Sequence, residues 1–194
     1  MELKILFSIL ASIIALIAYF PYLKDIFSQK TKPHAYTWFI WMLTQGTATL
    51  GVFYGGGSWG GLYLGIMTVE VIVVFLLSLK YGTKNITKGD TIILIAALIA
   101  IFIWWQLKQP LLSILMVSAI DVLGYVPSFR KSYKEPWSET LISWLLFAVA
   151  NILGILALSR YNLLTTTYLT SITIANMSLF LFCFFRRNFV KILN

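Results

Sequence analysis

Five polar side chains that could bind a solute or a proton lie inside long apolar stretches of this sequence. They are Gln45, Glu70, Asp121, Asn151 and Asn176, each near the middle of its apolar run. Such groups are costly in hydrocarbon, so they indicate a functional site that faces the protein interior or a cavity. We expect Gln45, Glu70, Asn151 and Asn176 to line a substrate site. Glu70 and Asp121 are the candidates to bind and release a proton.

The spacing of these residues indicates an internal repeat. A shift of 106 residues pairs Gln45 with Asn151 and Glu70 with Asn176. Asp121 breaks the symmetry, because the position that matches it holds Ala15. A repeat of this length organises the whole architecture. The same shift also pairs Tyr19 with Tyr125, Pro21 with Pro127 and Trp38 with Trp144.

The elements that must position these residues are membrane-spanning helices. The chain has 194 residues, of which 59% are hydrophobic and 11% charged, whereas soluble domains are roughly 45–50% apolar and about 25% charged. A span needs about 20 mostly apolar residues. The sequence therefore predicts an all-α integral membrane protein with seven transmembrane helices. They cover residues 3–23, 34–53, 61–79, 91–107, 110–129, 141–158 and 163–185.

The basic residues predict the orientation of these spans. Alternating loops place twelve of the fifteen Lys and Arg residues on one side, and the positive-inside rule makes that side cytoplasmic. We expect a multi-pass protein of the plasma membrane or a bacterial inner membrane, with its N-terminus outside and its C-terminus cytoplasmic. The basic side holds Lys24, Lys30, Lys32, Lys80, Lys84, Lys88, Arg130, Lys131, Lys134, Arg186, Arg187 and Lys191, and the other side holds Lys4, Lys108 and Arg160.

The repeat and the topology together predict three parts. Residues 1–82 form the first three-helix repeat, 83–107 a linker helix and 108–194 the second three-helix repeat. The linker span restores the orientation of the second unit, so the repeats are parallel and related by an axis along the membrane normal.

Proline and tryptophan residues at matching places indicate an inner gate. Pro21 and Pro127 lie near the cytoplasmic ends of their spans, where a proline kinks a helix or ends it. A kink could act as a hinge. Trp38 and Trp144 open the following helices, where they serve either a gate or the aromatic belt of the membrane interface.

A structural role for the polar residues is the alternative. Asparagine and glutamine often bridge neighbouring helices in membranes, so Gln45 and Asn151 fit helix bridging as well as site lining. Asp121 could be paired with a buried hydroxyl. Glu70 and Asn176 favour the site.

Enzymatic and cofactor functions lack the required residues. There is no Walker loop, no paired-cysteine metal site and no HExxH motif, and the single histidine, His34, is expected at the surface. We predict no enzyme, no cofactor and no metal, although Glu70 and Asp121 would be the carboxylate pair of an intramembrane enzyme. The net charge of +8 falls in membrane loops, so the expected partners are the lipid bilayer and a small-molecule substrate, with no nucleic acid. A homo-oligomer is compatible with the sequence.

The prolines and the three-plus-one-plus-three order of spans resemble the PQ-loop/SWEET (MtN3/saliva) superfamily over nearly the whole chain. Pro21 and Pro127 match its proline, while Tyr22 and Ser128 stand where the family has glutamine. The resemblance implies two parallel three-helix repeats around a central substrate site.

The third helix of each repeat carries the site residue of that family. In SWEETs an asparagine midway along this helix binds sugar; Asn176 matches it, and Glu70 replaces it in the first repeat. This replacement is more like the proton-coupled members. The tryptophans that stack sugar in SWEETs do not carry over, because Leu50 and Leu156 lie at about that depth.

The patterns favour a membrane transporter that moves a small polar solute, sugar or amino-acid-like, by alternating access through a midplane site. Proton coupling is an added expectation. One alternative is a receptor or trafficking protein of the KDEL-receptor kind, which binds a ligand without net transport and for which Arg160 is the candidate cation. Another is a structural membrane subunit without a ligand.

Overall fold

The chain folds into a bundle of helices, and the prediction of an all-α protein is confirmed. The structure is a computed structural model that describes residues 2–83, 86–107 and 109–190, and these residues contain no β-strand. The helices are α1 (Glu2–Phe27), α2 (Ala35–Tyr54), α3 (Trp59–Tyr81), α4 (Lys88–Leu107), α5 (Pro110–Gly124), α6 (Val126–Lys134), α7 (Leu141–Ala157) and α8 (Leu163–Arg186), with the 3₁₀ turn η1 (Pro136–Ser138) before α7.

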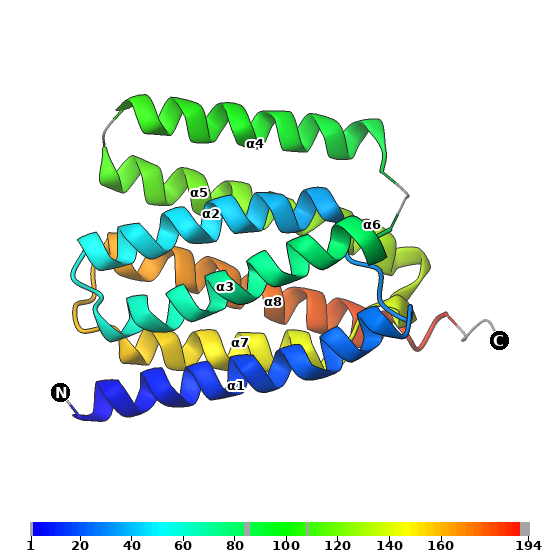
Figure 1. The fold of residues 1–194 in the computed structure, drawn as a ribbon, viewed down its shortest axis with the longest axis horizontal. Helices are drawn as coiled ribbons and strands as arrows, with labels where there is room; N and C mark the ends of the chain where they lie inside the picture. Colours follow the sequence, from blue (N-terminus) through cyan, green and yellow to red (C-terminus); the bar gives the residue numbers. More distant parts are fainter. Residues whose placement is uncertain (1, 84–85, 108, 191–194) are drawn as a thin grey trace.

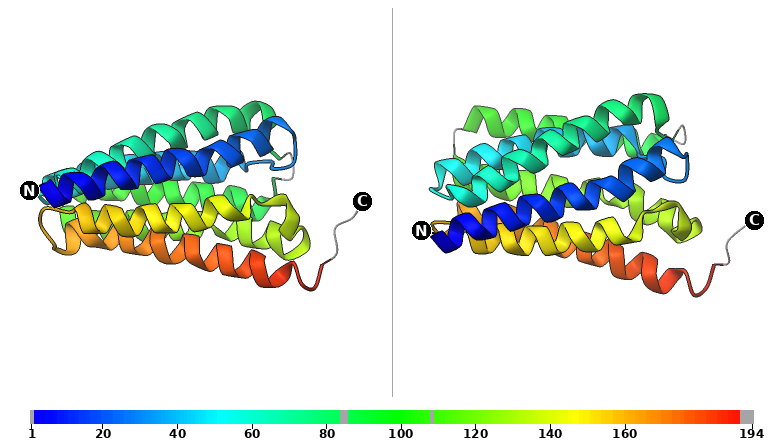
Figure 2. Two further views of the ribbon diagram at one scale, coloured as in Figure 1. Left: turned by 90° about the horizontal axis from the view of Figure 1, so that it is seen from below. Right: turned by 60° about the horizontal axis from the view of Figure 1, so that its bottom comes forward.

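The long helices lie side by side and run alternately in opposite directions, so the two chain ends lie at opposite ends of the bundle (Figures 1 and 2). α1 packs on α7 and α3, and α5 packs on α2 and α8. α4 lies on the outside of the bundle, against α5 and α2.

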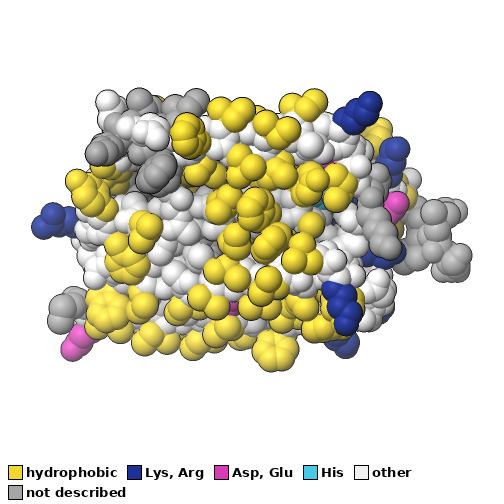
Figure 3. Space-filling view, turned by 45° about the horizontal axis from the view of Figure 1, so that its top comes forward, with side chains coloured by type: hydrophobic (Ala, Val, Ile, Leu, Met, Phe, Trp, Pro, Cys, Tyr) yellow, Lys and Arg dark blue, Asp and Glu magenta, His cyan; other side chains and the backbone are white. Residues whose placement is uncertain are grey.

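Length and composition make four of the described helical stretches able to cross a membrane. They are α1, α3, the stretch Pro110–Lys134 that joins α5 and α6, and α8; α7 is apolar but shorter. Large apolar side chains on the outer faces remain exposed, such as Phe20 and Leu50, and they form a band across the middle of the molecule (Figure 3). An apolar surface of this extent suits contact with lipid.

Most of the described basic side chains gather at one end of the bundle, which we call the basic end. It contains the α1–α2 turn, α6 and the end of α8, on the same side as the C-terminus in Figure 1. On the face drawn in Figure 3, most of the Lys and Arg side chains lie toward this end. Of the residues used to predict orientation, Lys84, Lys108 and Lys191 lie outside the described residues.

The helix that was expected over residues 110–129 is interrupted. α5 ends at Gly124 and α6 begins at Val126. Pro127 is the physical reason, because a proline has no N–H to continue the helical ladder. Pro21 behaves differently. It lies inside α1, which continues to Phe27, so only the second of the two matching prolines marks a helix boundary.

Close contact between α3 and α7 depends on a glycine. Tyr63 of α3 and Gly154 of α7 are in contact, and a Cβ atom at Gly154 would overlap the Tyr63 ring. Tyr63 is fully buried in the core cluster. This approach brings the Tyr63 hydroxyl to the middle of α7, where the candidate site lies.

Candidate functional site

A small cavity of about 30 Å³ lies in the centre of the bundle and is lined by residues of α1, α2, α3, α5, α7 and α8. Four of the polar residues singled out in the sequence line it: Gln45, Asp121, Asn151 and Asn176. Residues from both predicted repeats therefore share one cavity. Pro21 and Glu70 are not among the residues that line it.

Asp121 is held in place by hydroxyl groups. Its Oδ1 atom accepts hydrogen bonds from the Thr44 hydroxyl and from the Tyr168 hydroxyl, the latter at 2.8 Å. The Trp41 indole N–H donates to the backbone carbonyl of Asp121 at 3.1 Å. Asp121 is therefore paired with buried hydroxyl groups, as the structural alternative expected, and it is also one of the residues that line the cavity.

The two asparagines are each held by a tyrosine. The Tyr63 hydroxyl donates to Asn151 Oδ1, and the Tyr125 hydroxyl donates to Asn176 Oδ1, both at 2.8 Å. The Asn151 Nδ2 atom is buried and has no hydrogen-bond partner among the described residues, and the same is true of Gln45 Nε2. A buried N–H group without a partner costs free energy. These two amides therefore present donors that a solute in the cavity could satisfy.

Glu70 is the least satisfied group in the centre. Its side chain is 8% exposed, and neither carboxyl oxygen has a hydrogen-bond partner among the described residues. The Glu70 carboxyl interacts electrostatically with Tyr19 and Tyr63. Glu70 thus lies within electrostatic range of the cavity-lining Tyr19 but is not itself one of the lining residues.

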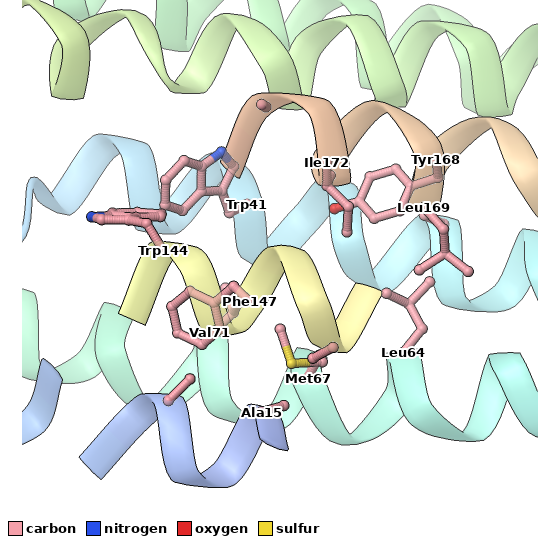
Figure 4. Packing of buried hydrophobic residues seen from close by; sticks show 14 of the residues in the cluster. Ala15, Trp41, Leu64, Met67, Val71, Trp144, Phe147, Tyr168, Leu169 and Ile172 are labelled. Atoms are coloured by element: carbon pink, nitrogen blue, oxygen red, sulfur yellow. The ribbon is translucent and has the colours of Figure 1, made fainter. Parts of the chain in front are cut away.

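Aromatic rings surround the rest of the cavity. Trp41 lies 4.7 Å from Tyr125 and 6.2 Å from Trp144, measured between ring centroids. Figure 4 shows Trp41 of α2 beside Trp144 of α7, with Phe147 one turn further along α7. Tyr19 of α1 packs against Phe147 at 4.9 Å. We call Tyr19, Trp38, Trp41, Tyr125, Trp144 and Phe147 the aromatic cage.

A second cavity of about 110 Å³ opens at the basic end. Trp38 and Trp144 line both this cavity and the central one. Both residues therefore border both spaces. Pro127 also lines the second cavity, whereas Pro21 lines neither of the two.

Trp144 is tied to an ion pair at the basic end. Its indole N–H donates to Glu139 Oε2 at 3.1 Å, and Glu139 Oε1 lies 2.5 Å from the Lys131 ammonium. Arg187 donates to the Glu139 backbone carbonyl at 2.8 Å. Because Glu139 is almost fully buried, this network fixes the side of the indole that faces the basic end.

A second carboxylate at the basic end is held in the same way. Asp90 lies 3.0 Å from the Arg130 guanidinium and accepts hydrogen bonds from the backbone N–H and hydroxyl of Thr87. His34, which was expected at the surface, is buried with its Nε2 atom 3.4 Å from Asp90. Among the described residues, no three His, Cys, Asp or Glu side chains come together as a metal site requires.

Sequence reasoning did not identify the residues that support the site. Thr44, Tyr63 and Tyr168 hold the polar side chains, and Glu139 holds Trp144. The signal in the sequence was weak, since a tyrosine or threonine in an apolar span is common and does not identify its partner.

Comparison with known proteins gives no further assignment. No family model matches the chain, and no curated protein or solved structure matches it either, so the resemblance to the PQ-loop/SWEET superfamily rests on the residues described above.

Proposed function

We propose that this chain is a seven-span membrane carrier that moves a small polar solute by alternating access through the central cavity. One observation carries the proposal: a central cavity whose lining residues include amides with unpaired N–H groups shares Trp38 and Trp144 with a second cavity at the basic end. Helix bridging alone would leave no reason for buried donors without partners, because such donors cost free energy in every membrane protein.

Helix packing supports the two-repeat architecture. α1 packs on α7 as α5 packs on α2, and α3 packs on α2 as α8 packs on α7. These pairs correspond under the shift of 106 residues, and α4 lies outside them. Two parallel three-helix repeats with a linker helix account for this pattern, and repeats of this kind place their substrate site at the interface between them.

The basic end belongs on the cytoplasmic side in this proposal, following the positive-inside rule. The Trp38–Trp144 pair is then the inner gate. Opening requires α2 and α7 to separate at this end, which would join the two cavities. The break between α5 and α6 at Tyr125 supplies a hinge next to that gate, and Glu70 is the group best placed to bind a proton during the cycle because no described residue satisfies its oxygens.

Cysteine labelling tests alternating access even while the substrate is unidentified. Val71 lines the central cavity, and Val69 on the same helix is 61% exposed on the outer face. Each is replaced by cysteine in a Cys183→Ser background, and a small charged methanethiosulfonate reagent is added to one side of sealed vesicles at a time. We expect Val71→Cys to react from both sides and Val69→Cys from neither.

The same experiment can reject the carrier. Val71→Cys that reacts from neither side would indicate a structural subunit with a closed core. Reaction from one side only would indicate a receptor whose site opens to one face of the membrane.

A further inference from the structure

We propose that the solute is a small organic cation, an ammonium compound that also carries a hydroxyl or carbonyl oxygen. This inference rests on the proposed function in one respect, because it takes the central cavity as the solute site. It is drawn from three properties of that cavity: its aromatic wall, its charge and its unpaired donors.

The wall of the cavity is suited to a cation. Six aromatic residues line it, three of them tryptophans. Tryptophan is the ring that attracts a cation most strongly, and desolvated contacts within about 6 Å of a ring are worth more than exposed ones. Trp41, Tyr125 and Trp144 lie 4.7–6.2 Å from one another, so a cation among them would contact several rings at once.

The only charged side chain among the described lining residues is acidic. Asp121 lines the cavity, and the described lining residues include no Lys, Arg or His. Glu70, which is not a lining residue, is buried with no described hydrogen-bond partner for its carboxyl oxygens. At the basic end, Arg130 and Lys131 pair instead with Asp90 and Glu139. An anion would meet the Asp121 carboxylate without a compensating cation, and a neutral solute would leave its charge unbalanced. A monovalent cation would balance it.

The unpaired amides specify the second part of the solute. Gln45 Nε2 and Asn151 Nδ2 are buried donors without described partners, and both residues line the cavity. They require an acceptor oxygen. A solute that places a hydroxyl or carbonyl near these amides and an ammonium against the rings would use every feature of the wall.

Size sets a limit on this solute. A cavity of about 30 Å³ holds about two water molecules. Binding therefore requires Trp38 and Trp144 to move apart, which joins the cavity to the space of about 110 Å³ at the basic end. The rings that contact the cation are then the same rings that form the gate.

A pair of compounds matched in shape but not in charge tests the inference. Choline and 3,3-dimethylbutan-1-ol have the same shape and the same hydroxyl, but only choline is charged. Thermal unfolding of the purified protein is measured with each compound and with glucose. We expect choline to raise the unfolding temperature, with little effect of the neutral alcohol at the same concentration. Loss of one desolvated ring contact corresponds to about a tenfold change in affinity or more, so Trp41→Leu should weaken choline binding by at least that factor.

Three further variants keep the test independent of folding. Asp121→Asn retains an oxygen for the Tyr168 and Thr44 hydroxyls but removes the charge, and it should also weaken choline binding. Asp90→Asn and Trp137→Leu change a carboxylate and a tryptophan at the basic end, outside the cavity, and should bind choline as the wild type does.

The outcomes separate this inference from the proposed function. Equal shifts with choline and the neutral alcohol, a shift with glucose alone, or no shift with any compound would overturn the cation assignment. If Val71→Cys still reacted from both sides, the carrier would stand with another solute. Choline binding together with one-sided labelling would keep the cation site and reject the carrier.

Discussion

Carboxylates at the basic end and carboxyl groups in the centre of the bundle are treated differently by this fold. At the basic end, Asp90 lies 3.0 Å from Arg130 and Glu139 lies 2.5 Å from Lys131. In the centre, no described cation lies within ion-pair distance of Glu70 or Asp121. All four side chains are at least nine-tenths buried, so burial does not explain the difference.

The difference indicates what each region is for. Desolvating a charge is costly unless a partner compensates for it, and the basic end supplies that partner within the chain. The centre does not. Asp121 receives two hydroxyl groups and Glu70 receives none. We infer that the ion pairs at the basic end hold the structure together, whereas the central groups are left for a solute or a proton.

The largest expected effect is on the free energy of unfolding, which Glu139→Gln should lower and Glu70→Gln should not. At Glu139 the substitution leaves the Lys131 ammonium facing an amide and weakens the support of Trp144. We expect a loss of about 3 kcal/mol in the free energy of unfolding, at the lower end for a broken buried pair, because Lys131 keeps 23% exposure. Glu70→Gln breaks no described contact and should leave this free energy unchanged or slightly raised.

Thermal and denaturant unfolding in detergent would measure both variants. The contrast between the two regions fails if Glu70→Gln destabilises the protein as much as Glu139→Gln does. That result would make Glu70 a structural residue with a partner that forms in the membrane, and it would remove Glu70 from the transport proposal.

The sequence allowed a good part of this arrangement to be predicted. Apolar stretches of the right length predicted helices, and the cost of burying polar groups predicted that Gln45, Asn151 and Asn176 would come together. The shift of 106 residues identified Trp38 and Trp144 as a pair, and both line the same two cavities.

Other features depended on side-chain geometry that spacing does not contain. Pro21 and Pro127 occupy matching positions, yet α1 continues through Pro21 and α5 ends before Pro127. Gly124, the last residue of α5, is another such feature. It leaves space for the Trp41 indole, because a Cβ atom at this position would lie 2.7 Å from Trp41 Nε1. Likewise, the sequence could not show that Glu70 is absent from the cavity lining while Asn176, its match under the repeat, is part of it.

A smaller effect on stability should distinguish Tyr125 from Tyr19, the residue that matches it in the first predicted repeat. Tyr125→Phe removes the hydroxyl that donates to Asn176, and we expect a loss of about 1 kcal/mol, the usual contribution of a buried hydrogen bond. Tyr19→Phe is the matched control under the repeat, because the structure describes no hydrogen bond from the Tyr19 hydroxyl. It should cost less than about 0.5 kcal/mol.

Unfolding free energies of the two phenylalanine variants would decide this point. Equal losses would mean that the Tyr19 hydroxyl supports Glu70 as Tyr125 supports Asn176. The carboxyl group would then have a partner within the chain, and the argument that it is left for a proton would be lost.

The smallest expected effect is the acid sensitivity of the basic end. Burial alone would raise the pKa of Asp90, but hydrogen bonds from Thr87 and the charges of His34 and Arg130 outweigh it and lower the pKa below its ordinary value. A lowered pKa contributes stability above the ordinary value, about 3.9, and that stability is lost as the pH falls through the folded-state value. Because Arg130 is 43% exposed, we expect a contribution of about 1 kcal/mol or less.

The free energy of unfolding, measured from pH 7 down to pH 3, should therefore decline less steeply in Asp90→Asn than in the wild type. Glu135→Gln, an exposed control at the same end, should follow the wild type. If the stability of Asp90→Asn declined with falling pH as steeply as that of the wild type, the Asp90–Arg130 pair would contribute no net stability. The contrast with the central carboxyl groups would then rest on Glu139 and Lys131.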